Sequence, residues 1–187
     1  MFRSIIKITG VLLVSLSLTG CATLSKEECQ RGNWFQVGYT DGAEGQTIDR
    51  LNEHIKACAD YKIAPDQMAY QQGRMQGVQQ YCQTKGYSIG QKNQEYAWVC
   101  PKDLERKFLT DYMFGLKNIL QETTLTYQQK QMDLNIEVGK MIALRESKDN
   151  KQINRIESLR NELRTLEQKQ RDISGKINHV EHYLSTQ

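Results

Sequence analysis

The chain has few prolines, and residues 102–187 contain neither proline nor cysteine. Only two prolines and five cysteines occur among 187 residues, and none of them lies after Pro101. Because proline interrupts a helix by removing a backbone donor, its absence allows long unbroken helices over residues 102–187. A segment without cysteine also cannot hold a disulfide. We therefore divide the chain near residue 101, into a cysteine-bearing part and a cysteine-free part.

Motifs that name a reaction are also missing. The sequence has no phosphate-binding loop, no nucleophile elbow and no metalloprotease motif. Three pairs of residues have a spacing that could carry chemistry: the acids Asp41 and Glu44, the nucleophile pair His54 and Cys58, and the metal ligands His179 and His182. Surface acids and solvated histidines are commoner than such sites, and a disulfide at Cys58 would remove the nucleophile. We therefore assign no catalytic residue, no metal site and no cofactor, and expect a protein that is not an enzyme.

The first 20 residues differ from the rest in charge and hydropathy. Arg3 and Lys7 precede an apolar run over residues 8–18 that is too short to cross a bilayer comfortably. This pattern is typical of a secretion signal, so residues 1–20 are expected to be removed. Their removal takes the formal net charge from +3 to +1. A near-neutral chain has no strong attraction to nucleic acid, and we expect no nucleic-acid partner.

Residues 18–21, with the sequence Leu-Thr-Gly-Cys, resemble the lipobox of bacterial lipoproteins. The resemblance implies that the sulfur of Cys21 is diacylated, that cleavage makes Cys21 the first residue, and that its amine is then acylated too. Two or more acyl chains would hold the protein stably on a membrane. Ala22 stands where an Asp usually retains Gram-negative lipoproteins in the inner membrane. The resemblance therefore implies an outer-membrane lipoprotein on the periplasmic face, with residues 21–28 as its tether.

The four cysteines that follow Cys21 are expected to form two disulfides, because an even set in an oxidising compartment normally pairs. They are Cys29, Cys58, Cys82 and Cys100. A structural zinc site is the alternative, but it needs close pairs such as Cys-x-x-Cys, whereas the gaps here are 29, 24 and 18 residues. Three pairings are possible, and we expect the sequential one, Cys29–Cys58 with Cys82–Cys100. Loops of this size would each contribute about 3–3.5 kcal/mol.

Residues 29–101 are expected to form a small helical domain held by these disulfides. Three helices are readable, over about residues 33–45, 47–61 and 65–82. Asn33 can cap the first of them, and Pro65-Asp66 can open the third. Residues 86–99 place aromatic side chains between polar ones, and either a short hairpin or an irregular loop fits that stretch.

A Tyr-x-x-Gly pattern occurs four times, although only about 0.6 matches are expected by chance. The copies are Tyr39/Gly42, Tyr70/Gly73, Tyr87/Gly90 and Tyr112/Gly115. Two of them extend into Gly-x-x-x-Gly, at Gly38/Gly42 and Gly73/Gly77. Because glycine costs a helix up to about 1 kcal/mol relative to alanine, we expect close helix packing to justify it there.

The residues beside these glycines allow two interpretations. In the structural one, Asp41 and Arg74 form an ion pair across a tightly packed helix crossing. In the functional one, Trp34, Tyr39 and Tyr70 line a groove that binds a sugar or a peptide. The structural interpretation is the one that we favour.

Further fixed spacings extend over about residues 21–116. They are Glu28-Cys29, Asn33-Trp34, Gly38-x-x-Asp41-Gly42-x-x-Gly45, His54-x-x-x-Cys58, Pro65-Asp66-x-x-x-Tyr70-x-x-Gly73-Arg74-x-x-Gly77, Tyr81-Cys82, Val99-Cys100-Pro101 and Phe108-x-x-x-Tyr112-x-x-Gly115. This set resembles a bacterial lipoprotein family known only as domain of unknown function 2799. Asn33 departs from the family, where Asp is expected, but both residues cap a helix. The resemblance implies a compartment and a cysteine framework, and no activity or ligand.

Residues 102–187 have the pattern of two helices joined by a turn. Apolar residues recur at mostly helical spacing over residues 103–145, and a polar break follows at 147–152. From Ile156 to Leu184 the apolar residues step by three and four, with only Gln170 polar, which is a heptad seam. The short break favours a hairpin within one chain over pairing with another chain. The expected fold is therefore mainly α: a small disulfide-stapled helical domain followed by a long helical hairpin, or coiled coil.

A regular seam on a chain that offers no chemistry favours a structural function. We expect a non-enzymatic component of the cell envelope that binds a protein partner through residues 103–187, with self-association as an option. A periplasmic glycan- or peptide-binding module is the alternative. An envelope hydrolase is the third interpretation, and it would need polar groups that converge in a cleft.

Overall fold

The computed structural model describes residues 23–143 and 150–186 of the chain. Within those residues the structure contains no strand, and the helices are α1 (Lys26–Arg31), α2 (Trp34–Ala43), α3 (Arg50–Ala59), α4 (Gln67–Thr84), α5 (Gly86–Gln91), α6 (Lys102–Ala143) and α7 (Asn150–Ser185). The mainly α fold is therefore confirmed. None of the described helices combines the length and the apolar character that crossing a membrane requires. The expected signal peptide and the lipidation site Cys21 lie outside the described residues.

Helix caps fix where the first helices begin. The Asn33 side chain accepts a hydrogen bond from the Gln36 backbone N–H, and Asp66 accepts one from Ala69, as the sequence led us to expect. A helix that the sequence did not suggest, α1, begins inside the segment interpreted as a tether. Its Ser25 cap exchanges hydrogen bonds with Glu28 in a capping box. The Ser25 backbone N–H also holds the pKa of the Glu28 carboxyl below its usual value.

The stretch over residues 86–99 is neither a hairpin nor loop throughout. It begins with the short helix α5 and continues as an irregular segment to Cys100. Asn93 and Trp98 in that segment have positive φ angles, both of 54°. A helix forms at residues 86–91 because Gly86 and Gly90 allow the backbone of α5 to rest directly on α6.

Two disulfides hold the N-terminal half of the described chain. Cys29 of α1 is bonded to Cys58 of α3, and Cys82 of α4 is bonded to Cys100, just before α6. The pairing is the sequential one of the three possibilities. Each bond attaches a short or irregular segment to a helix, since α1 has only six residues and the segment 92–100 has no regular structure.

Buried apolar side chains form two clusters. The smaller joins α1, α2 and α3 to the start of α4 and contains Leu24, Cys29, Trp34, Leu51, Cys58 and Tyr70. The larger joins the end of α4 to the first part of α6 and the last part of α7, and includes Phe108, Leu116 and Ile177. The larger cluster crosses residue 101, so the base of the hairpin packs against the cysteine-bearing part. The division of the chain at residues 101 and 102 stays a prediction.

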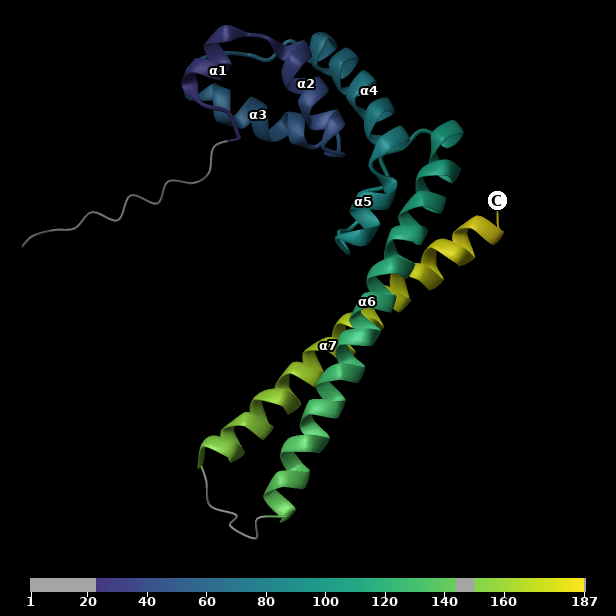
Figure 1. Ribbon diagram of the computed structural model, residues 1–187. Coiled ribbons are helices and arrows are strands. Elements are labelled where there is room, and N and C mark those ends of the chain that lie inside the picture. Colours follow the sequence, from purple (N-terminus) through teal and green to yellow (C-terminus); the bar gives the residue numbers. More distant parts are fainter. Residues whose placement is uncertain (1–22, 144–149, 187) are drawn as a thin grey trace, which may run out of the picture.

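Helices α6 and α7 form the expected hairpin and reach far beyond the rest of the molecule (Figure 1). Along α7 the predicted seam is buried at Ile156, Leu159, Leu163, Ile173, Ile177 and Val180. Its polar member, Gln170, donates a hydrogen bond from Nε2 to the Thr124 hydroxyl of α6 at 2.9 Å. The seam therefore closes within one chain.

Candidate functional site

The paired glycines of α2 and α4 bring two helix backbones into direct contact. A Cβ added to Gly38 would lie 2.0 Å from the Tyr70 carbonyl oxygen, and one added to Gly77 would lie 2.1 Å from that of Tyr39. Gly42 and Gly73 are equally close to backbone atoms of the facing helix. No side chain fits at such distances, so these four positions require glycine. The glycines of this crossing therefore serve close helix packing, as the structural interpretation of the pattern expects.

A second crossing of the same kind joins α5 to α6. A Cβ on Gly90 would lie 2.0 Å from the Tyr112 carbonyl oxygen, and one on Gly115 would lie 2.2 Å from that of Tyr87. The two crossings can be matched glycine by glycine, because equivalent glycines meet equivalent backbone atoms of the facing helix. Gly38 matches Gly86, Gly42 matches Gly90, and Gly77 matches Gly115. The fourth position, Gly73 in the first crossing, is Asp111 in the second.

This equivalence changes how the Tyr-x-x-Gly repeat is understood. Gly38 meets the carbonyl of Tyr70, and its equivalent Gly86 meets the carbonyl of Phe108, so Tyr70 corresponds to Phe108. By the same comparison at Gly42 and Gly90, Arg74 corresponds to Tyr112. Only the copies on α2 and α5 occupy matching places. The repeat in the sequence therefore marks two crossings, but in a register that the spacing alone does not reveal.

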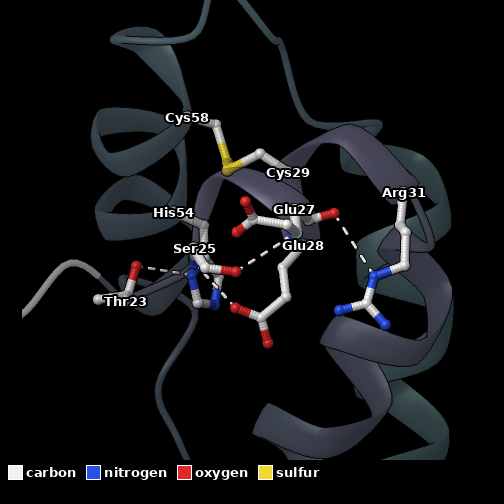
Figure 2. Close-up of a disulfide and its surroundings, with 8 residues drawn as sticks. All are labelled: Thr23, Ser25, Glu27, Glu28, Cys29, Arg31, His54 and Cys58. Atoms are coloured by element: carbon white, nitrogen blue, oxygen red, sulfur yellow. Dashed lines mark hydrogen bonds between the residues drawn. A yellow bond between two sulfur atoms is a disulfide. The ribbon is translucent and has the colours of Figure 1, made fainter.

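A buried polar cluster lies beside the first crossing and connects three helices and the N-terminal segment. One oxygen of Asp41, Oδ2, accepts hydrogen bonds from Nε2 of His54 and from the Tyr70 hydroxyl, both at 2.7 Å. Nδ1 of His54 lies 2.8 Å from the Thr23 hydroxyl (Figure 2). With the Nε2 proton directed at Asp41, Nδ1 accepts the Thr23 hydrogen. His54 is only 2% exposed and Asp41 7%, and burial with the Asp41 carboxylate raises the pKa of Tyr70 well above its usual value.

The predicted ion pair between Asp41 and Arg74 is wrong. Asp41 is engaged by His54 and Tyr70, while Nη2 of Arg74 donates to the Gln46 carbonyl at 2.8 Å. Both residues flank glycines, but on each helix the glycines occupy the face that meets the other helix. The flanking side chains therefore point away from the crossing line, toward different neighbours.

The groove predicted from Trp34, Tyr39 and Tyr70 is also wrong. Trp34 is 5% exposed and Tyr70 is 0% exposed, and both belong to the smaller apolar cluster. Tyr39 is half-buried, and its hydroxyl donates to the Gln80 side chain. Since Trp34 and Tyr70 fill the core around the first disulfide while Tyr39 lies outside that cluster, the three rings do not line a common binding surface.

A cavity of about 390 Å³ borders the polar cluster. Thr23, Asp41 and His54 contribute to its wall together with charged side chains that include Arg50. The Nε of Arg50 is buried and has no hydrogen-bond partner among the described residues. A hydroxyl, an imidazole and a carboxylate in this order are what nucleophilic hydrolases use. This cavity is where polar groups converge.

The other pairs considered for chemistry do not assemble. Glu44 ends α2 exposed on the surface, while Asp41 is buried. Cys58 is in a disulfide, so it offers no thiol beside His54. His179 packs edge-on to the Trp98 ring with centroids 5.5 Å apart, and His182 is exposed. In residues 23–143 and 150–186 no three histidine, cysteine or acidic side chains are grouped as a metal site would require.

An apolar stripe on the solvent side of α6 was not expected from the sequence. Phe114, Leu125, Met132 and Ile136 are between 53% and 66% exposed. With 3.6 residues per turn, their Cα atoms lie within about 20° of one line along the helix. We call these four residues the outer stripe. Its sequence signal is the steps of 11, 7 and 4 residues, all near whole numbers of helical turns.

The opposite side of α6 faces α7. The Tyr127 hydroxyl donates to Glu167 at 3.0 Å, Lys130 pairs with Glu162 at 2.6 Å, and Thr124 accepts from Gln170. Thus α6 has two apolar faces in its outer half, and α7 covers only one of them. Large exposed apolar patches on soluble proteins commonly mark a surface that meets another molecule.

Comparison with known proteins gives a family match for one part of the chain. Residues 33–117 match the model of a family described as "Protein of unknown function (DUF2799)". This confirms the resemblance drawn from the fixed spacings. No curated protein and no solved structure matches the chain. The matched range contains both glycine crossings and ends before the outer stripe is complete.

Proposed function

We propose that this chain, whose residues 33–117 match the model of the DUF2799 family of unknown function, is an outer-membrane lipoprotein whose hairpin binds another protein of the cell envelope. The acyl chains on Cys21 anchor it to the periplasmic face. The compact part stays near the membrane, and α6 and α7 reach outward. In this proposal the protein catalyses no reaction and serves as a structural or docking component.

Two observations support the location. The chain has the disulfides Cys29–Cys58 and Cys82–Cys100, and such bonds are typical of proteins outside the reducing cytosol. The lipobox-like residues 18–21 supply an anchor at Cys21. Thr23, held by His54, is two residues from Cys21, so an acylated Cys21 would keep the polar cluster close to the lipid surface.

The outer stripe is the observation that carries the docking function. Leaving Phe114, Leu125, Met132 and Ile136 in water has no structural benefit for a hairpin that already closes through its inner seam. Helix α7 has 36 residues, which corresponds to about 54 Å of helix. A surface carried this far from the anchor can meet a partner well away from the membrane.

Site-specific photocrosslinking in intact cells tests this function. A photoreactive residue placed at Leu125 or Met132 should give one discrete crosslinked product. The matched control is Lys169, which is exposed on the polar side of α7. Equal, diffuse labelling from all three positions would contradict the proposal. Leu125→Glu with Met132→Glu should abolish the product, whereas the control pair Gln168→Glu with Asn178→Glu, also on exposed positions, should preserve it.

A hydrolase is the second candidate, favoured by the chain of Thr23, His54 and Asp41 beside the 390 Å³ cavity. In that function Thr23 would be the nucleophile, His54 the base and Asp41 the group that orients the imidazole. A fluorophosphonate probe should then label Thr23, detectable by mass spectrometry, and the label should be lost in His54→Ala. A chain that remains unlabelled after prolonged exposure to the probe would exclude this candidate.

A further inference from the structure

A second cavity lies where the irregular segment after α5 meets the last part of α7. Its volume is about 360 Å³, within the range of small-molecule sites, and its wall includes Glu95, Trp98, Asp172, Gly175 and His179. Residues 171, 172, 175, 176 and 179 of α7 all contribute, because steps of three and four bring them to one helix face. Neither the polar cluster nor the outer stripe includes any of these residues.

Gly175 is the first indication that this cavity is a site. A glycine inside a helix costs up to about 1 kcal/mol relative to alanine. The seven glycines of the two crossings have a packing reason, since a Cβ on each would collide with facing backbone. A Cβ on Gly175 would meet no atom within 4 Å. Because Gly175 lines the cavity, a larger side chain at this position would take up open space beside it.

Trp98 is the second indication. This bulky residue has a φ of 54°, a conformation that side chains other than glycine and asparagine rarely adopt, and it is 41% exposed. Its ring contacts the rings of Tyr96, His179 and Tyr183 at centroid distances of 5.0 to 5.5 Å. The backbone is therefore held in a costly conformation that keeps an indole at the mouth of the cavity.

Ion pairs and hydrogen bonds connect the two walls of the cavity, with the Glu95 side chain 81% exposed at its edge. Lys176 is paired with Glu95 at 3.0 Å and with Asp172 at 3.1 Å, and it also donates to the Asn93 carbonyl. The segment is further held at Cys100, whose backbone N–H donates to the Tyr96 hydroxyl at 3.0 Å and whose sulfur is in a disulfide. Preorganised walls reduce the ordering cost of binding.

Charge limits what can bind. The wall has two cations, Arg171 and Lys176, and two carboxylates, Glu95 and Asp172, so it has no surplus of either sign. Lys176 is already neutralised by both carboxylates, and hydrogen bonds from Asn93 and Lys176 hold the pKa of Asp172 below its usual value. A phosphate or another strong anion would find no free cation cluster here. The carboxylate oxygens keep further lone pairs for hydroxyl donors.

We propose that this cavity binds a neutral pyranose glycan, with a sugar ring against Trp98, hydroxyl groups on Glu95 and Asp172, and the space above Gly175 filled by the sugar. A sugar ring suits these walls because it has an apolar face for an indole and a rim of hydroxyl donors for carboxylates. The proposal concerns residues other than the docking surface, and it holds or fails independently of the docking function.

Calorimetric titration tests the site on the full chain, solubilised in a detergent without a sugar headgroup. The probes are tetra-N-acetylchitotetraose, cellotetraose and maltotetraose at millimolar concentrations. We expect saturable binding of at least one of them. Gly175→Ala should weaken that binding several-fold and Gly175→Met should abolish it, while neither variant lowers the melting temperature. Trp98→Gly should also abolish binding.

Gly139→Ala is the matched control, because Gly139 lies inside α6 and likewise has no atom within 4 Å of its Cβ position. It should raise the melting temperature as much as Gly175→Ala and leave glycan affinity unchanged. Absence of binding for all three probes would overturn the proposal. So would binding that survives Gly175→Met, or a site that takes a short peptide or a phosphorylated sugar and no neutral glycan.

Discussion

The two ends of α6 are stabilised by different interactions: backbone contact and disulfides near its start, and side-chain packing near its end. The first part of α6, residues 102–120, belongs to what we call the crossing region, which also includes residues 23–100. In this region glycines allow helix backbones to touch, and two disulfides link the elements. Residues 121–143 and 150–170 form the arm, where side chains alone hold two helices together. Glycine is obligatory at the crossings of the first region, whereas a Cβ added to Gly139 in the arm would meet no atom within 4 Å.

The difference shows why the two regions suit different tasks. Backbone contact gives the crossing region one fixed geometry, which suits a scaffold that holds a buried polar cluster and a cavity. The arm has no fully buried α6 side chain after Thr123 among the described residues, so its outer half keeps an apolar face available. The family match follows this division, since its range of residues 33–117 lies within the crossing region and does not reach the arm.

The largest effect is expected from breaking the crossing region at its disulfides. Replacing both cysteines of either bond by alanine should lower the free energy of unfolding by about 3–3.5 kcal/mol. The physical reason is the regained freedom of loops of 29 and 18 residues in the unfolded chain. Denaturant titration followed by near-ultraviolet circular dichroism measures it. A loss below about 1 kcal/mol would show that the helix crossings alone define this region.

Alanine substitutions at glycines of the crossings and of the arm should have opposite effects on stability. Gly77→Ala and Gly115→Ala should each lower the unfolding free energy by about 3 kcal/mol, because the new Cβ would lie 2.1 or 2.2 Å from a carbonyl oxygen. Gly139→Ala should raise it by up to about 1 kcal/mol. Thermal unfolding of the three variants, measured side by side, provides the test. Similar shifts for all three would mean that the crossings are not tight.

Alkaline pH should destabilise the crossing region through its buried tyrosines. Burial raises the pKa of Tyr81, Tyr96 and Tyr112, all in the crossing region, to about 12. Because the folded pKa lies above the unfolded value of about 10, their contribution to stability is complete below pH 10 and is lost between about pH 10 and 12. Tyrosinate absorbance should therefore rise together with loss of near-ultraviolet dichroism. Ionisation of all tyrosines near pH 10 without unfolding would contradict their burial.

The smallest effect on stability is expected at the outer stripe. Leu125→Glu and Met132→Glu remove exposed side chains, so each should change the unfolding free energy by no more than about 0.5 kcal/mol. A melting curve of each variant checks this, with Leu163→Ala, a buried position on α7, as the destabilised comparison. A large loss from Leu125→Glu would show that α6 packs on that side within the monomer.

Local patterns predicted much of this fold. Helix caps at Asn33 and Asp66 and the seam from Ile156 to Leu184 depend on residues close in sequence, and periodicity reports such features directly. The hairpin followed from the shortness of its break. The sequential cysteine pairing was one of three options, and the structure has that one.

Features that depend on helix rotation could not be predicted. Asp41 and Arg74 flank glycines on crossing helices, but only the rotation of each helix decides that Asp41 meets His54 instead. The groove at Trp34 stayed open as an alternative because the burial of this ring depends on α1, which the sequence did not reveal as a helix. The outer stripe escaped notice because the inner residues of α6 gave an equally good helical pattern.

Hydrogen exchange along α6 tests the central comparison most directly, because one unbroken helix passes through both regions. In the purified protein, amides at residues 108–117 should exchange about 100-fold or more slowly than those at residues 128–140. That result would show a fixed crossing region carrying an arm whose outer half gains little from its own packing. Uniform protection along the whole helix would contradict the account.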